Sequence, residues 1–140
     1  MGNEELISAL NEQLSAEYQA IVQYIQYSAV VTGPHRPELV RFFQDELPDE
    51  QAHAQYLANE VSVLGGTPTT AVPPVPIDTD PHKLLENVLD AETRAVEAYT
   101  ALARLADEAG EPTIRIQMEH FIEDESSHRH ETEKILKGKW

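Results

Sequence analysis

The chain has 140 residues, of which 41% are hydrophobic and 25% charged, a composition typical of one globular domain. It contains no cysteine, which excludes disulfides, cysteine-ligated zinc and iron–sulfur clusters. Ten basic residues against 25 acidic ones give a net charge of −15, a balance that disfavours nucleic acid and favours cations as partners.

Breaks rich in proline and glycine divide the chain into four segments whose apolar residues recur with a helical period. Within a single domain spanning residues 1–140, we predict helices over 4–32, 37–64, 81–109 and 112–137. Asp80 has the character of an N-cap before Pro81, and Gly65 that of a helix stop.

The long break at residues 65–79 indicates how the helices are connected. Each predicted helix is about 42 Å long at 1.5 Å per residue. An extended, proline-rich segment of this length spans about the same distance. The second and third helices can therefore run parallel. The predicted fold is all-α, a four-helix bundle of two antiparallel hairpins joined by a long crossover.

The first two helices carry ionisable residues on their apolar stripes. Glu17 lies in the middle of the stripe of the first helix, seven residues before Tyr24. Glu50 and His53 lie three residues apart on the second, which places both side chains on one helix face. Glu46 and Glu60 belong to the same stripe, which is noisier than the others. We interpret them as solvated boundary acids, with a role in feeding metal to the centre as the alternative.

The second half of the chain repeats this pattern. Glu92 interrupts the stripe of the third helix, and the fourth carries Glu125 and His128 at the same three-residue spacing. Corresponding residues of the halves are 75 positions apart, as are Tyr24 and Tyr99. Such a repeat is expected if each hairpin supplies half of one dinuclear site.

Four carboxylates and two imidazoles in mid-helix require a cationic counterpart, because an unpaired buried ion costs several kcal/mol. No lysine or arginine lies on these stripes, whereas two divalent metal ions would balance four carboxylates. The predicted metal ligands are one glutamate from each of two helices and a Glu-x-x-His pair from each of the others: Glu17, Glu50, His53, Glu92, Glu125 and His128.

This ligand pattern resembles that of ferritin-like di-iron or di-manganese carboxylate proteins, and the chain is most similar to bacterioferritin. The resemblance implies that Glu50 and Glu125 bridge two metals, which the remaining glutamates and histidines complete in the pairs Glu17–His53 and Glu92–His128. It also implies a catalytic position near the centre for Tyr24. Gln51 stands where bacterioferritin has its haem methionine, so we expect no haem, and we also expect no fifth helix after residue 137.

We expect two iron ions per chain, with manganese as an alternative, and oxidation of Fe²⁺ by O₂ or H₂O₂ in iron storage or detoxification. One alternative is a peroxide-reducing enzyme similar to rubrerythrin or manganese catalase. Another is a helical bundle that binds a partner without catalysis. Asp49, Asp90 and Asp124 are the candidates for orienting the two imidazoles.

The sequence also predicts where the protein acts and with what. Its apolar runs are only a few residues long, and its acidic start lacks the features of a signal peptide. We therefore expect a cytoplasmic protein without membrane or nucleic-acid partners, and the resemblance implies a homo-oligomer, a dimer or larger.

Overall fold

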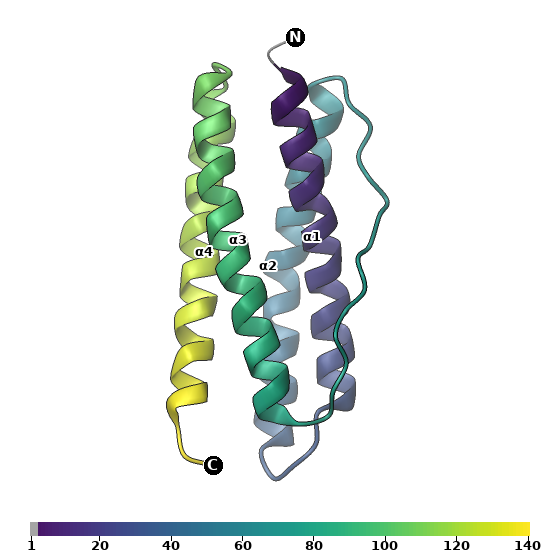
Figure 1. Ribbon diagram of the computed structural model, residues 1–140, viewed down its shortest axis with the longest axis vertical. Coiled ribbons are helices and arrows are strands. Elements are labelled where there is room, and N and C mark those ends of the chain that lie inside the picture. The colour runs from purple at the N-terminus through teal and green to yellow at the C-terminus, as the bar shows by residue number, and fades with distance from the viewer. Residues whose placement is uncertain (1–2) are drawn as a thin grey trace.

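The computed structural model describes residues 3–140, which form four long helices and no strands (Figure 1). They are α1 (Asn3–Val30), α2 (Arg36–Val63), α3 (Pro81–Glu108) and α4 (Pro112–Lys137). Their ends lie within two residues of the predicted ones. Asp80 is confirmed as the N-cap of α3, because its carboxylate accepts a hydrogen bond of 3.0 Å from the backbone N–H of Lys83.

The helices form the predicted bundle of two antiparallel hairpins, α1 with α2 and α3 with α4 (Figure 1). The segment between α2 and α3 runs along the length of the bundle beside α1, so that α2 and α3 are parallel (Figure 1). The all-α fold and its long crossover are thereby confirmed. Within residues 3–140, no helix is both long enough and apolar enough to cross a membrane.

The crossover is held against α1 by a row of polar side chains one turn apart. Each donates a hydrogen bond to a crossover carbonyl: Asn11 to Thr67, Ser15 to Ala71 and Gln19 to Pro74, at 2.8–2.9 Å. Tyr27 extends the row with a bond of 2.6 Å to the carbonyl of Pro76. The four-residue spacing places these donors on one face of α1, which is why they meet a single extended segment.

The buried side chains form two apolar clusters, separated along the bundle by a polar layer. One cluster includes Leu10, Leu57 and Met118, and the other includes Tyr27, Phe43 and Leu85. The middle of each helix contributes to the layer between them, where the buried glutamates and histidines of the sequence pattern lie. The apolar clusters thus stabilise a bundle whose centre is unusually polar.

We predict that Tyr27→Phe lowers the free energy of unfolding by about 1–2 kcal/mol, because it leaves two polar groups without their partner. The Tyr27 hydroxyl donates to the Pro76 carbonyl and accepts from the Asn87 amide at 3.2 Å. Urea denaturation measures the change. Tyr56→Phe is the matched control, because the Tyr56 hydroxyl has no hydrogen-bond partner among the described residues. Equal effects of the two substitutions would contradict the prediction.

Candidate metal centre

The six predicted ligands come together at mid-height of the bundle, where all of them are buried. Together with Glu46, they form two groups, and within each group the ligand atoms lie within 4.8 Å of one another. The first group consists of Glu17, Glu50, His53 and Glu125, and the second of Glu46, Glu92 and His128. Every helix contributes to this centre, so it forms only when both hairpins are in place.

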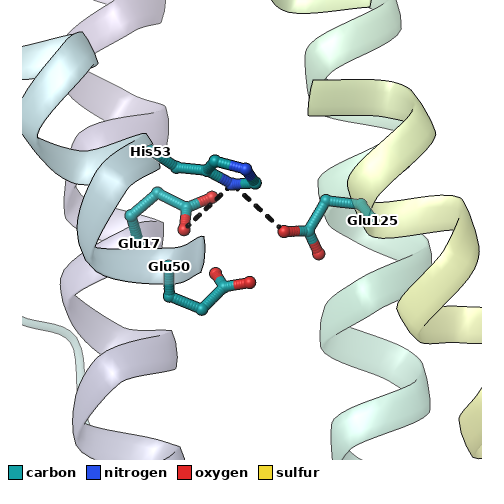
Figure 2. A group of neighbouring side chains, drawn as sticks. All are labelled: Glu17, Glu50, His53 and Glu125. Atoms are coloured by element: carbon teal, nitrogen blue, oxygen red, sulfur yellow. Dashed lines mark ion pairs between the residues drawn. The ribbon is translucent and has the colours of Figure 1, made fainter. Parts of the chain in front are cut away.

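Figure 2 shows the first group, in which His53 faces three glutamates from α1, α2 and α4. Its Nδ1 lies 3.3 Å from Glu125 Oε1 and 3.9 Å from Glu17 Oε2 (Figure 2). Neither contact has the alignment of a hydrogen bond. The imidazole nitrogen and the carboxylate oxygens instead converge on a common point.

The second group is arranged around His128. Its Nδ1 lies 2.8 Å from Glu46 Oε2, 3.7 Å from Glu50 Oε1 and 4.0 Å from Glu125 Oε1. Glu50 and Glu125 therefore lie between the two histidines. This is the position from which a carboxylate can bridge two metal ions.

The outward nitrogen of each imidazole is bound by an aspartate from the opposite hairpin. His53 Nε2 lies 2.9 Å from Asp124 Oδ2, and His128 Nε2 lies 3.0 Å from Asp49 Oδ2. These pairs confirm Asp49 and Asp124 as the orienting groups, while Asp90 is exposed and the structure gives it no such contact. An aspartate on Nε2 accepts a hydrogen bond there and directs Nδ1 inward, where it can serve as a ligand once its own proton is released.

Glu17 and Glu92, the two glutamates outside the central pair, are oriented in the same way, each by the hydroxyl of a tyrosine from the other half of the chain. Tyr99 donates to Glu17 Oε1 at 2.6 Å, and Tyr24 donates to Glu92 Oε2 at 3.2 Å. Gln13 adds a bond of 3.0 Å to Glu17 Oε1. Each carboxylate therefore has one oxygen occupied and the other free. The sequence repeat related the two tyrosines but did not reveal their partners, and it gave no signal for Gln13.

Seven buried ligand atoms in the centre have no hydrogen-bond partner among the described residues. They are Glu17 Oε2, Glu46 Oε2, Glu50 Oε1, Glu92 Oε1, Glu125 Oε1, His53 Nδ1 and His128 Nδ1. Buried polar atoms are rarely left unpaired, and here all seven are acceptors or metal donors in two compact groups. The oxygen-rich donor set with two imidazoles fits two ions of iron or manganese.

The interpretation of Glu46 as a solvated acid is wrong. Its side chain is buried, and its carboxylate belongs to the second group. The repeat contained a signal that we missed: the residue 75 positions later is Phe121, a core residue whose ring lies 4.0 Å from that of His53. The carboxylate of Glu46 beside His128 thus has a phenyl ring as its counterpart beside His53, which makes the two groups chemically different.

The electrostatics of the centre follow from burial and from the proximity of like charges. Burial raises the pKa of Glu17 and Glu50, and it raises that of Glu92 to about 8. Burial alone would lower the pKa of His128, but the adjacent Glu46 raises it to about 9. Burial would likewise raise the pKa of Glu125, yet contacts with His53 and Glu50 lower it. Without metal, the centre therefore holds its carboxylates together partly by taking up protons.

Comparisons with known proteins agree with this geometry. A family model described as a ferritin-like domain matches residues 7–138. Bacterial ferritin of Neisseria meningitidis serogroup B is 29% identical over 97% of this chain and 89% of its own. A ferritin-like, diiron-carboxylate protein from Bacillus anthracis is 36% identical, with a TM-score of 0.94 over 97% and 98% of the two chains. A dodecameric thioferritin, the bacterioferritin-related protein of Bacteroides fragilis, is 25% identical, with a TM-score of 0.86 over 95% and 84%.

We predict that Glu46→Gln lowers the pKa of His128 in the metal-free protein by about one unit or more, because it removes the nearest negative charge. An NMR titration of the histidine rings measures this value directly. Asp45→Asn, which neutralises an exposed acid of the same helix, should leave it unchanged. An unaltered His128 pKa in the Glu46 variant would mean that Glu46 lies away from the centre in solution.

We further predict that the metal-free protein melts at lower temperature as the pH rises from about 5 to about 9. The raised pKa values mean that the native state binds more protons than the unfolded state, so its stability falls as these protons leave. The contribution of Glu92 is complete below its unfolded pKa near 4.5 and is lost through about 8; that of His128 is lost through about 9. Within the centre, the lowered pKa of Glu125 acts in the opposite direction, but only below its unfolded value near 4.5 and therefore outside this range.

Thermal melts monitored by circular dichroism, with a chelator present, test this dependence. Glu92→Gln should flatten the slope between about pH 5 and 8, because the amide carries no charge to release. A melting temperature that rises across this range would be incompatible with a buried cluster of carboxylates.

Proposed function

The chain belongs to the ferritin-like family, and from this membership and its buried centre we propose that it binds two Fe²⁺ ions and oxidises them to Fe³⁺ with O₂ or H₂O₂. The observation that carries the proposal is the set of seven buried ligand atoms that lack an aligned hydrogen bond to any described residue. Their organisation around two histidines supports two ions per chain. The similarity to a diiron-carboxylate protein supports iron as the metal.

The charge of the centre favours the oxidised product. Five ionised carboxylates carry a charge of −5, which lies between the +4 of two ferrous ions and the +6 of two ferric ions. Hard, anionic oxygen ligands stabilise the higher charge more strongly, since the interaction grows with the charge of the ion. Binding in a buried site therefore makes Fe²⁺ a better electron donor than it is in water.

We assign the six predicted ligands and Glu46 to two ions, following the two groups in which they lie. Glu17 and His53 hold one ion, and Glu92 and His128 the other. Glu50 and Glu125 bridge, and Glu46 adds a carboxylate on the side of His128. Tyr24 lies one hydrogen bond from a ligand, close enough to take part in the reaction as the resemblance to bacterioferritin implies.

We also propose that the chain assembles with copies of itself, as the dodecameric relative from Bacteroides fragilis does. Several large apolar side chains are half exposed or more in the single chain, among them Ile25 on α1 and Val72 on the crossover. Such side chains are usually covered in an assembly.

Aerobic addition of Fe²⁺ to the metal-free protein tests the proposed reaction. We expect a ferric absorbance band that develops rapidly and saturates at two Fe²⁺ per chain, and we expect Glu50→Ala to slow it by about a hundredfold or more because the variant loses a shared ligand. Glu60→Ala, a partly buried acid of the same helix outside both groups, is the control. Oxidation at the wild-type rate in the Glu50 variant would exclude the proposed site.

A further inference from the structure

A groove between α1 and α3 connects the surface with the metal centre. It is a cavity of about 370 Å³ whose lining includes exposed Glu12 and Arg94 as well as buried Glu50 and Glu125. The apolar part of its lining is mostly alanine, contributed by both helices: Ala9, Ala16, Ala20, Ala91, Ala95, Ala98 and Ala101. Two pairs among them, Ala16 with Ala91 and Ala20 with Ala95, are related by the 75-residue repeat. The groove is therefore built alike from both halves of the chain.

The groove is much larger than iron oxidation requires. A water molecule accounts for about 30 Å³ in the liquid, and O₂ and H₂O₂ are of similar size. Sites for small organic molecules begin at about 300 Å³ and have mostly apolar walls with a few polar groups. In helical proteins, larger side chains ordinarily fill such a space, because interiors are closely packed. The alanines leave room for a molecule with an apolar body.

One polar group in this wall lacks a partner. Gln23 lines the groove and is buried, and its amide nitrogen donates no hydrogen bond to any described residue. A buried amide without a partner costs about 1–3 kcal/mol unless a ligand supplies an acceptor. A ligand oxygen would satisfy this donor.

The charges around the groove select a neutral ligand. Its inner end is formed by the carboxylates of Glu17, Glu50, Glu92 and Glu125, which repel an anion such as a fatty acid. The alanine walls offer no ligands to replace the water shell of a cation. The ligand that fits is uncharged and apolar, with an oxygen-bearing head directed at the centre.

We propose that this groove binds organic hydroperoxides and delivers them to the metal centre as the oxidant. This inference rests on the proposed oxidation of Fe²⁺. Two Fe²⁺ each give up one electron, the O–O bond of the hydroperoxide breaks, and two protons are taken up. The products are two Fe³⁺, one alcohol and one water.

Binding is tested without iron. Cumyl alcohol, the reduced product of cumene hydroperoxide, should bind to the metal-free protein in a saturation-transfer NMR experiment. Ala20→Leu and Ala95→Leu each fill the groove from one wall and should weaken binding by about tenfold or more. Ala29→Leu, on an exposed position of α1 outside the groove, should not. Leucine is nearly as good a helix former as alanine, so both variants are expected to fold. Circular dichroism identifies a variant that does not fold, and the remaining groove-filling variant then provides the test.

Reaction is tested by stopped-flow oxidation of bound Fe²⁺ with cumene hydroperoxide and, separately, with H₂O₂. The groove-filling variants should lose the reaction with cumene hydroperoxide while they keep that with H₂O₂. Equal losses with both oxidants, no loss with either, or no binding of cumyl alcohol to the wild type would each overturn the inference. If the wild type failed to oxidise Fe²⁺ with O₂, H₂O₂ or cumene hydroperoxide, the proposed function would fail instead, and the binding of the alcohol would still decide whether the groove holds such a ligand.

Discussion

Five carboxylates lie together in the middle of a bundle that would otherwise be apolar, and the rest of the structure depends on how they are held there. The ligand atoms of each group lie within 4.8 Å of one another, and ionised carboxylates so close together repel one another strongly in a low-dielectric interior. Tyr24 donates a hydrogen bond to one oxygen of Glu92, and Tyr99 and Gln13 donate to one oxygen of Glu17. The second oxygen of each of these carboxylates has no such bond within residues 3–140. The two apolar clusters on either side supply the stability that this layer lacks. The protein thus keeps an unfavourable arrangement of charge that proton uptake relieves only in part, and functional sites commonly conflict with stability in this way.

Each half of the chain supplies ligands to the centre and also holds ligands of the other half in place. Asp124 of the second hairpin orients His53 of the first, and Asp49 of the first orients His128 of the second. The tyrosines cross between the halves in the same manner. Because each hairpin completes the ligands of the other, neither can form the centre alone. The repeat is broken where Glu46 corresponds to Phe121, so one side of the centre is more anionic and the other more apolar.

Much of this arrangement was readable from the sequence because it depends on periodicity. Glutamates in the middle of apolar stripes, and prolines and glycines between them, predicted the helices, the topology and the six residues that the structure brings together. Glu46 was missed because the stripe of α2 carries several acids, and periodicity alone does not distinguish a buried acid from one at a boundary. The partners of Tyr99 and the role of Gln13 depend on how helices from different halves approach each other, which no pattern within a single helix determines.

The crossover has a consequence for how the protein behaves among other chains. An extended segment on a surface ordinarily presents alternating N–H and C=O groups, and a neighbouring chain can pair with them as with an exposed strand edge. Here the side chains of Asn11, Ser15, Gln19 and Tyr27 already occupy carbonyls of the segment. Its four prolines, Pro68, Pro73, Pro74 and Pro76, have no N–H to offer. The segment that makes the parallel arrangement of α2 and α3 possible is thereby a poor template for β-sheet aggregation, even though it lies on the outside of the bundle.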